Sequence, residues 1–308
     1  MRETDIAAFW SSHPCGEQLA GGRAREEQGD YASFFTRYDA FKYELESHIP
    51  RCLDGLDVAG RRVLEIGLGQ GAESEQLIRR GAKWTGVDLT EASLERVRTR
   101  LTQRNLPFDG LHRASVLDLP FEAESFDMVF SHGVLHHVPD IIAAQREIHR
   151  VLVPGGELVA MLYARWSLNY LIAIGLVRRM ALAVTVPLAR VGLLQPTGVV
   201  GAHVRNARTT GLFEYLRMRE FIHHNTDGPD NPYARVYDSR TVRQSFPDFS
   251  LTRAYKRFMH APPLPVHRLP GAALAGWHLW VHLRPRVRTT HPVGPRSIGV
   301  SPRGVEPR

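Results

Sequence analysis

Cysteine and long apolar runs are scarce in this chain. Only Cys15 and Cys52 occur among its 308 residues, which excludes a disulfide framework and a cysteine-rich metal site. The histidines lack a ligand set at convincing spacing, so no bound metal is expected. Arg178 and Arg179 divide the longest apolar stretch into pieces shorter than the roughly 20 residues of a transmembrane helix. We therefore expect no membrane-spanning helix.

A secretory signal and a nucleic-acid-binding motif are also missing. Residues 1–5 are polar and acidic, which is unlike a signal peptide and predicts a cytoplasmic protein. The net charge of +7 does not mark a basic binding face, because residues 284–308 carry six arginines and one glutamate. This tail is rich in proline and glycine and is expected to be disordered. Since the chain has no basic motif interleaved with aromatics, no specific nucleic-acid partner is expected.

Short apolar runs alternate with amphipathic stretches in the first half of the chain. Strands are expected at 61–66, 83–88, 111–116, 126–131 and 157–163, and helices at 71–80, 91–104 and 140–152. Thr90 is expected to cap the second of these helices. Such alternation predicts an α/β fold with a doubly wound parallel sheet and helices on both faces. A ligand would then bind at the carboxyl ends of the strands.

A glycine turn follows the first predicted strand. Gly67, Gly69 and Gly71 come directly after the apolar run that ends at Ile66, and they open into a helix. A ligand can lie on the bare backbone of such a turn. Seventeen residues beyond Gly71, a second apolar run ends in Asp88, whose carboxylate can accept both hydroxyls of a ribose. Together these features predict a nucleoside-containing cofactor.

Glu65 distinguishes between two cofactor classes. The glycines, followed by Ala72, also satisfy the loose dinucleotide pattern G-x-G-x-x-G/A. A carboxylate two residues before the first glycine would repel an incoming pyrophosphate. It suits a cationic ligand, such as an amino-acid ammonium beside a sulfonium. The sequence therefore favours a sulfonium nucleoside over a nicotinamide dinucleotide.

Further motifs follow in order over residues 60–163. They are Leu64-Glu65-Ile66-Gly67-x-Gly69-x-Gly71, Gly86-Val87-Asp88-Leu89, Leu119-Pro120-Phe121, Ser125-Phe126-Asp127-x-Val129, Val134-Leu135-His136-His137 and Leu152-x-Pro154-Gly155-Gly156. With these motifs the chain resembles the class I S-adenosylmethionine-dependent methyltransferases, above all the bacterial small-molecule subgroup related to the quinone C-methyltransferases. The resemblance implies a seven-stranded sheet of order 3-2-1-4-5-7-6 with the last strand antiparallel. It also implies S-adenosylmethionine as cofactor, with Glu65 and the glycine turn holding its methionine part and Asp88 its ribose.

The resemblance extends the cofactor site to further positions. Family members usually carry an aspartate after the third strand, where it accepts a hydrogen bond from the adenine amino group. Here Ser115 stands in that place, followed by Val116. Ser115 can accept a hydrogen bond but brings no charge. The remaining predicted cofactor residues are Leu89, Ser131 and His132.

Five regions are expected along the chain. They are an N-terminal helical cap (1–56), a Rossmann-like cofactor-binding core (57–163), an insert (164–238), a C-terminal completion of the sheet (239–284) and the basic tail (285–308). Aromatic residues at helical spacing predict one helix from Tyr31 to Leu53, with Tyr31 and Tyr38 at the cofactor mouth. Ser239 is expected to cap the first helix of the closing region. The closing strands are expected near 249–259 and 277–283.

The insert is long, and it is apolar at 170–177 and 180–188. Long loops in compact domains are usually functional. The favoured interpretation is a helical lid that excludes water and shapes a pocket for a hydrophobic acceptor. The second interpretation is an interfacial amphipathic segment in peripheral membrane contact, helped by Arg178, Arg179 and Arg190. A homodimer contact is the third.

Histidines are the candidate bases for a methyl transfer, since imidazole titrates near neutral pH. His137, paired with His136 after the fourth strand, and His224 in the insert are the catalytic candidates. A packing role for the His-His pair is favoured, because a resemblance of fold does not fix a catalytic role. The predicted function is methyl transfer to a small, hydrophobic or aromatic acceptor in secondary metabolism. A membrane-associated quinone or lipid methyltransferase and a non-catalytic cofactor-binding partner protein are the alternatives.

Overall fold

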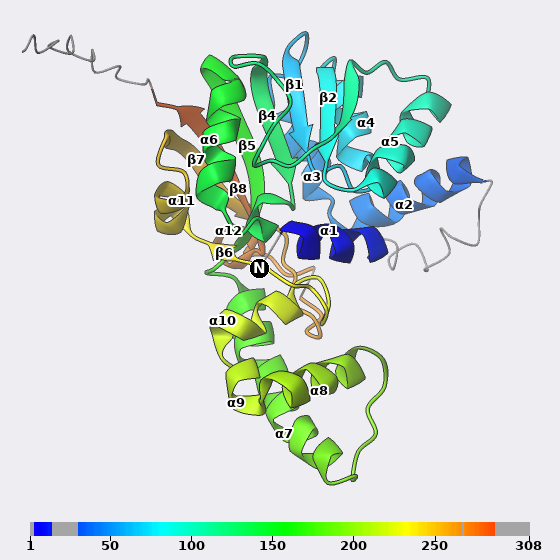
Figure 1. The fold of residues 1–308 in the computed structure, drawn as a ribbon, viewed down its shortest axis with the longest axis vertical. Coiled ribbons are helices and arrows are strands. Elements are labelled where there is room, and N and C mark those ends of the chain that lie inside the picture. The colour runs from blue at the N-terminus through cyan, green and yellow to red at the C-terminus, as the bar shows by residue number, and fades with distance from the viewer. Residues whose placement is uncertain (1–2, 14–29, 267, 287–308) are drawn as a thin grey trace, which may run out of the picture.

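A central sheet organises the computed structural model, which describes residues 3–13, 30–266 and 268–286 (Figure 1). Its strands are β1 (Arg62–Ile66), β2 (Lys83–Asp88), β3 (Gly110–Arg113), β4 (Phe126–His132), β5 (Leu152–Ala164), β6 (Val236–Tyr237), β7 (Phe249–Arg257) and β8 (His278–Pro285). Cys15 and all but the first two residues of the predicted disordered tail lie outside the described residues.

The predicted α/β topology is confirmed. The strand order is β3-β2-β1-β4-β5-β8-β7, and β8 runs antiparallel to both β5 and β7. The other pairs along this path are parallel. The two-residue strand β6 pairs with β5 and is an addition to the seven predicted strands. The carboxyl ends of β1, β2 and β4 therefore meet at one edge of the sheet, where ligands bind in such folds.

Both faces of the sheet are buried. Neighbouring residues along a strand belong to different apolar clusters: Val63 and Met128 pack on one face, and Leu64 and Val129 pack on the other. The helices over the first face are α4 (Ala72–Arg79) and α5 (Glu91–Gln103), and those over the second are α6 (Ile141–Val151) and α11 (Ser239–Ser245). A strand that is buried on both faces has a continuous apolar sequence. For this reason the strands could be predicted from the sequence.

Of the two predicted helix caps, the position of Thr90 is confirmed and that of Ser239 is wrong. Thr90 stands at the N-cap of α5, but its Oγ1 donates to Asp88 Oδ1 at 2.8 Å and makes no side-chain cap bond. Asp238, not Ser239, caps α11, because Asp238 Oδ1 accepts from Thr241 N at 2.8 Å. Thr241 Oγ1 in turn accepts from Asp238 N at 2.8 Å. This reciprocal pair forms a capping box and moves the helix start by one residue.

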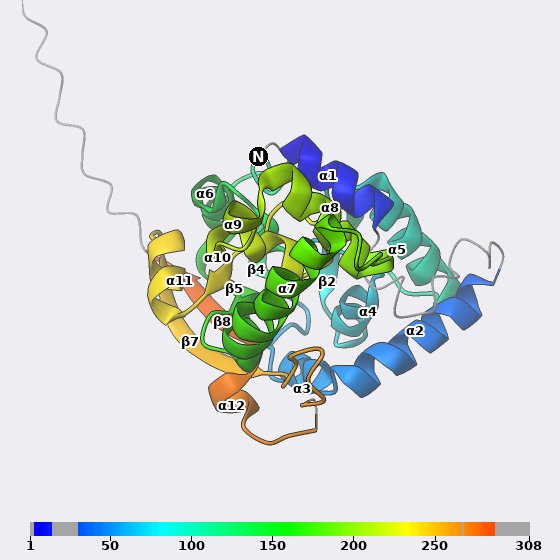
Figure 2. The same ribbon diagram turned by 90° about the horizontal axis from the view of Figure 1, so that it is seen from below.

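The predicted helix from Tyr31 to Leu53 is instead two helices, α2 (Tyr31–Leu45) and α3 (His48–Asp54). Pro50 lies in the first turn of α3, where its missing N–H costs no helical hydrogen bond. One continuous helix would need that N–H, so the break falls before the proline. α1 (Glu3–Ser12) and α2 lie along the sheet edge that carries the strand carboxyl ends (Figures 1 and 2).

The insert is helical and projects away from the sheet (Figure 1). Its elements are η2 (Asn169–Arg178), α7 (Arg179–Arg190), α8 (Gly198–Thr210), α9 (Leu212–Tyr215), α10 (Met218–Phe221) and η3 (His223–Asn225). η2 is π-helical and continues directly into α7. The insert therefore begins with one long helix.

The expectation that two arginines divide the apolar run of the insert is wrong. The Arg178 guanidinium donates to the backbone oxygens of Asn225 and Pro262, each at 2.7 Å, so its hydrogen bonds are made inside the fold. Over the part of the chain that the structure describes, the helix Asn169–Arg190 is the one long and apolar enough to cross a membrane. Within the most apolar stretch of this helix, 22% of the residues are buried in the protein.

Candidate active site

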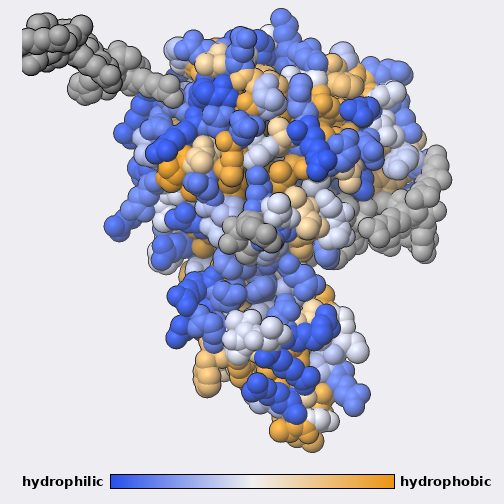
Figure 3. Space-filling model, viewed as in Figure 1, coloured by the Kyte–Doolittle hydropathy of each residue, from blue (hydrophilic) through white to orange (hydrophobic). Residues whose placement is uncertain are grey.

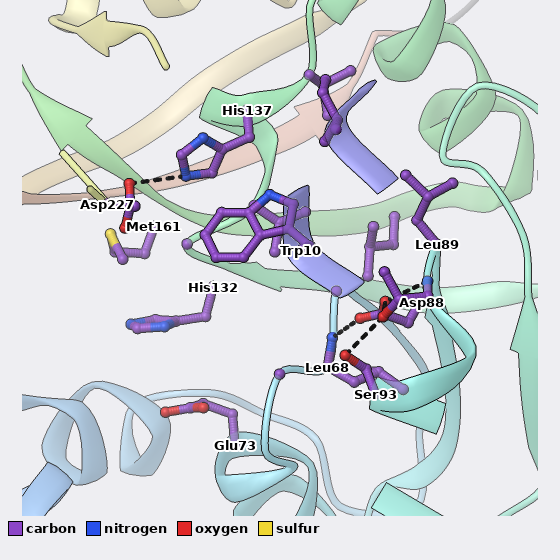
Figure 4. Close-up of a pocket in the computed structure, with 18 of the residues that line it drawn as sticks. Trp10, Leu68, Glu73, Asp88, Leu89, Ser93, His132, His137, Met161 and Asp227 are labelled. Carbon is purple, nitrogen blue, oxygen red and sulfur yellow. Dashed lines mark hydrogen bonds and ion pairs between the residues drawn. The ribbon is translucent and has the colours of Figure 1, made fainter. Parts of the chain in front are cut away.

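A cavity of about 690 Å³ lies at the carboxyl ends of β1, β2 and β4 (Figure 4). This volume is typical of small-molecule sites. The glycine turn, α1, α2, β8 and residues 226–228 of the insert contribute to its lining. Trp10 of α1 lies between Asp88 on one side and His132 on the other (Figure 4). The cavity thus has an Asp88 end and a His132 end.

The backbone of the glycine turn has a conformation that is strained for residues other than glycine. Gly67, Gly69 and Gly71 have φ angles of 77°, 52° and 74°, in the left-handed region that favours glycine. A Cβ added at Gly67 would lie 2.2 Å from a methyl group of Val134. Gly67 and Gly69 line the cavity, and Gly71 is the N-cap residue of α4. Bare backbone therefore faces the cavity, as a turn that binds a ligand requires.

Asp88 is held by the turn that it faces. Its Oδ2 accepts from Leu68 N at 2.8 Å, and its Oδ1 accepts from both N and Oγ1 of Thr90 at 2.8 Å. The Gly69 backbone N–H also donates to Asp88 and lowers its pKa, so donors of the protein meet about all of the roughly four acceptor sites of this carboxylate. Burial raises the pKa of Asp88 despite these donors. The carboxylate therefore shapes the turn, and since Asp88 also lines the cavity, a ligand hydroxyl would share or replace one of these donors.

Glu65 is a buried carboxylate in the cavity wall. The residue is 2% exposed, and its Oε2 accepts from Trp84 Nε1 at 2.7 Å. Burial raises the pKa of Glu65 to about 8. Burying a carboxylate is costly unless a positive charge accompanies it. A cationic ligand beside Glu65 would therefore be stabilised.

The other predicted cofactor residues fall into two sets. Leu89, Val116 and His132 line the cavity. Ser115 and Ser131 are not among the described residues that line it. The Ser115 hydroxyl donates to the Glu3 carboxylate, and Ser131 Oγ donates to Ile66 O at 3.1 Å. A cofactor contact for these two serines stays a prediction.

Of the two catalytic candidates, His137 lines the cavity and His224 lies outside it. His137 Nδ1 lies 2.7 Å from Tyr233 O, and its Nε2 lies 3.3 Å from Asp227 Oδ2. The Tyr163 hydroxyl donates to Asp227 Oδ1 at 2.8 Å. These contacts tie the turn after β4 to the insert. Because both ring nitrogens of His137 face protein oxygens, the geometry favours packing, and catalysis by either histidine stays a prediction.

Comparison with known proteins points to one family. Residues 64–160 match a family described as a methyltransferase domain. The ubiquinone biosynthesis O-methyltransferase of Alkalilimnicola ehrlichii is 34% identical over 128 residues, which cover 41% of this chain and 51% of that protein. The phthiotriol/phenolphthiotriol dimycocerosates methyltransferase 1 of Mycobacterium ulcerans is 37% identical over 106 residues, covering 34% and 38%. The chain spans about half the length of the curated relatives it matches.

A solved structure shares the fold over most of the chain. Geranyl diphosphate C-methyltransferase from Streptomyces coelicolor A3(2) aligns with a TM-score of 0.53 and 14% identity, over 92% of this chain and 97% of that chain. Over residues 64–160 the chain is similar to a methyltransferase domain. The glycine turn, Glu65 and Asp88 all lie within the matched residues of this methyltransferase domain.

The His132 end of the cavity is rich in charged and titratable groups. Lys42 Nζ of α2 lies 2.7 Å from Glu73 Oε1 of α4, and both residues line the cavity. Although burial opposes the shift, Lys42 holds the pKa of Glu73 at about 2. On β8, His278 Nδ1 lies 3.1 Å from His48 Nε2 of α3. This end of the cavity therefore combines an ion pair with neutral imidazoles.

The sequence did not reveal the lining residues outside the methyltransferase motifs. They include Glu3, Trp10, Lys42, Glu46, Asp227, Phe258, Trp277 and His278. Tyr38 was predicted at the mouth and lines the cavity, whereas Tyr31 stacks on Phe35 with ring centroids 5.9 Å apart and lies outside it. Helical spacing identifies an apolar stripe but not what the stripe faces, so no local signal marks these residues.

Proposed function

We propose that this chain transfers a methyl group from S-adenosylmethionine to a small, hydrophobic or aromatic acceptor. The observation that carries the proposal is the cavity with two different ends. The Asp88 end has the glycine turn and two carboxylates, and the His132 end has aromatic and histidine side chains. The names of the curated relatives support the same type of reaction.

The residues of the Asp88 end fit this cofactor. The bare turn leaves room for the ligand, Glu65 offers a buried negative charge to a sulfonium or ammonium, and Asp88 offers an acceptor to a ribose hydroxyl. The bound cofactor would supply an electrophilic methyl group. The protein then has to hold the nucleophile close to that methyl group and in line with its leaving bond. Trp10 and side chains of α2 line the cavity in which this alignment would take place.

Two measurements test the proposal. Calorimetry should show binding of S-adenosylmethionine and S-adenosylhomocysteine but not of NAD. Transfer of labelled methyl from the cofactor to a panel of phenols, quinols and aromatic amines tests the reaction itself. Preference for NAD, or failure to bind either sulfur nucleoside, would refute the proposal. Cofactor binding without turnover on any panel member would favour the non-catalytic partner protein.

Binding of S-adenosylmethionine should strengthen as the pH rises towards 8. Without ligand, burial raises the pKa of Glu65 to about 8, so the group is largely protonated at neutral pH. A neighbouring cation favours the carboxylate and lowers this pKa. The affinity should therefore rise by up to about tenfold per pH unit below 8 and level off above it. Calorimetry across this range should show a flat profile for Glu65→Gln, and an equal slope in that variant would contradict the assignment.

We also propose that the insert contacts an anionic membrane surface. The far end of the insert exposes apolar side chains that we term the tip cluster (Figure 3): Met180, Val184, Val191, Leu193, Leu194, Val199 and Val200. Val191 is 71% exposed and Leu193 is 72% exposed. Exposed apolar patches of this kind mark interaction surfaces. Because Leu182 and Val186 are buried on the other side of Asn169–Arg190, this helix would lie on a membrane and not cross it.

The charge around the tip cluster fits an anionic partner. Between Glu157 and Glu214 the sequence has six arginines and neither aspartate nor glutamate. Arg190, Arg205 and Arg208 are exposed on the two helices that carry the cluster. Apolar side chains flanked by basic residues are typical of segments that bind to anionic lipid surfaces.

Vesicle flotation tests the membrane contact. The full chain should float with phosphatidylcholine vesicles that contain phosphatidylglycerol. Leu193→Ser combined with Leu194→Ser should weaken binding by at least about tenfold, since burying one leucine contributes about 1.5–3 kcal/mol. Leu274→Ser, at an exposed leucine of α12 (Ala272–Ala275) outside the insert, is the matched control. A wild-type chain that stays unbound would refute the contact, and a dimer that the double variant dissociates would identify a homodimer interface instead.

A further inference from the structure

Glu46 places a carboxylate at the His132 end of the cavity. The residue follows directly after α2 and lines the cavity, and its side chain is 19% exposed, so a ligand can reach it. Its Oε1 lies 3.6 Å from Nε2 of His278 on β8. The rings of His278 and His132 lie 5.8 Å apart between centroids, and Figure 4 shows His132 on the other side of Trp10 from Asp88. Glu46 therefore lies at the end of the cavity where the acceptor would bind.

The other carboxylates of the cavity already accept hydrogen bonds from the protein. Those that do so among the described residues are Glu3, Glu65, Glu73, Asp88, Asp140 and Asp227. Glu46 differs from them, because its contact with His278 Nε2 at 3.6 Å is longer than a hydrogen bond. Since buried polar groups are normally paired, the Glu46 carboxylate is suited to a donor group of a ligand.

The ionisation of Glu46 suits a general base. Burial raises its pKa to about 7. Of the charged groups around it, Lys42 of α2 lowers this pKa and Glu73 of α4 raises it. His278, which faces it from β8, is neutral, because burial lowers the pKa of this imidazole well below its usual range. A base whose pKa lies near neutral pH is present as the carboxylate and can still hold a proton.

Aromatic side chains line the cavity beside this carboxylate. The Phe258 ring lies 4.7 Å from the His278 ring between centroids. Tyr163 and Trp277 stack on each other with centroids 4.4 Å apart, and all of these residues line the cavity together with Glu46. Walls of this kind bind flat rings by offset or edge contacts. We therefore expect an aromatic acceptor here, with its polar group directed towards Glu46.

A carboxylate base suits a methyl donor that is a sulfonium. Before the transfer the site would hold one positive charge on sulfur and one negative charge on Glu46, and after the transfer it would hold neither. Charged groups are costly in a buried site, so the loss of both charges favours the reaction there. A neutral hydroxyl keeps this balance, whereas a protonated amine would bring a second positive charge next to the sulfonium. The nucleophile that fits best is therefore a phenolic hydroxyl.

We infer, on the basis of the methyl transfer proposed above, that Glu46 is the catalytic base and that the acceptor is a phenol. The phenolic oxygen forms a bond to the methyl carbon while its proton passes to a carboxylate oxygen of Glu46. The bond between that carbon and sulfur breaks, and its electron pair stays on sulfur. The products are a methyl aryl ether, S-adenosylhomocysteine and protonated Glu46, which then releases its proton to water. During the transfer the charges of the sulfonium and the carboxylate cancel, so the net charge of the site is unchanged.

The first test measures binding by calorimetry. It uses the full chain loaded with S-adenosylhomocysteine, at a pH at which Glu46 and 4-nitrophenol are ionised but 4-methylphenol is neutral. Glu46→Gln, which keeps the size of the side chain, should weaken binding of 4-methylphenol by about five- to tenfold, since a hydrogen bond to a charged acceptor is stronger. It should strengthen binding of the 4-nitrophenol anion by at least about tenfold, because like charges repel in the wild type. The affinity for S-adenosylhomocysteine should not change.

The second test measures methyl transfer with saturating S-adenosylmethionine. With 4-methylphenol, Glu46→Gln should be slower than wild type by about 10²–10⁴-fold, the usual contribution of a general base. With 4-nitrophenol, which needs no base once it is ionised, the variant should be at least as fast as wild type. Glu44→Gln is the matched control, because Glu44 is exposed on the same helix and lies outside the cavity. It should leave both affinities and both rates unchanged.

Four results would overturn the inference or the proposal beneath it. Equal affinity of wild type and Glu46→Gln for 4-methylphenol, or a parallel loss of rate with both phenols, would overturn the assignment of Glu46. A loss of affinity for S-adenosylhomocysteine as large as the loss of rate would instead assign Glu46 to cofactor binding. A wild type that binds S-adenosylmethionine but methylates neither phenol would overturn the choice of acceptor. Failure of the wild type to bind S-adenosylmethionine is a separate result that refutes the proposed function itself.

Discussion

Replacing Gly67 with alanine should weaken binding of S-adenosylmethionine by at least about 100-fold, or about 2.7 kcal/mol. Gly67 has a φ of 77°, a conformation that costs an L-residue about 1–2 kcal/mol. The new Cβ would also lie 2.2 Å and 2.9 Å from the two methyl groups of Val134. Since backbone strain and clash both act on the turn that faces the cavity, the turn must move. Calorimetry measures the loss of affinity, and thermal unfolding measures the strain.

Gly60→Ala separates strain from clash. Gly60 has a φ of 72°, but a Cβ there would meet no atom within 4 Å. This control should lose only the roughly 1–2 kcal/mol of folding free energy that the strained backbone costs. Its affinity for the cofactor should be unchanged. Val134→Ala added to Gly67→Ala should restore part of the affinity by removing the clashing methyl groups. Equal cofactor affinity in Gly67→Ala and wild type would show that the turn does not contact the cofactor.

The methyltransferase core was predictable because its determinants are local. The strand that ends at Ile66, the glycine turn and Asp88 lie close together in the sequence, and the register of β1 with β2 places Ile66 opposite Val87. Buried parallel strands leave apolar runs, and a left-handed turn requires glycine. The sheet order came from the resemblance to the family, since hydropathy alone does not order strands.

The long insert helix was not predictable from charge pattern alone. Arg178 interrupts the apolar run in sequence, but its guanidinium bonds to carbonyl oxygens 47 and 84 residues away along the chain. Such contacts satisfy the charge without ending the helix. The same limit applies to the cavity lining, because Trp10 and Asp227 reach the cavity from opposite parts of the chain. Their places depend on tertiary packing that no local motif records.

The sequence motif did not identify which histidines of the chain make hydrogen bonds within the protein. The His-His pair drew attention through its motif, yet His136 is fully buried and His137 contacts backbone and carboxylate oxygens. His132 was predicted only as a cofactor neighbour and lines the cavity, and its Nε2, like both ring nitrogens of His136, has no hydrogen-bond partner among the described residues. Hydrogen-bond satisfaction is a three-dimensional property, so the sequence could not rank these rings.

Replacing Arg100 with leucine should lower the free energy of unfolding by about 3–5 kcal/mol. Arg100 of α5 is 0% exposed, and its Nε donates to Glu75 Oε2 at 2.9 Å. Its other end donates to the carboxylate of Asp39 on α2 and to Gln70 O. Without the guanidinium, two carboxylates stay in the interior with less compensating charge. Because this contact also holds α2 over the cavity, cofactor affinity should fall as well.

Arg79→Leu is the matched control for this prediction. Arg79 contacts the same carboxylate, with Nη2 2.7 Å from Glu75 Oε1, but its side chain is 46% exposed. Water replaces an exposed partner, so this variant should lose only about 0–1 kcal/mol.

Although burial opposes the shift, Arg100 and Arg79 lower the pKa of Glu75. The stability that this carboxylate contributes is therefore complete above its unfolded pKa of about 4.3 and is lost as the pH falls through the lower folded value. Urea unfolding should accordingly show that the difference in free energy of unfolding between wild type and Arg100→Leu becomes smaller below about pH 4. If this difference is the same at neutral and acid pH, the loss of packing and not the loss of charge accounts for it.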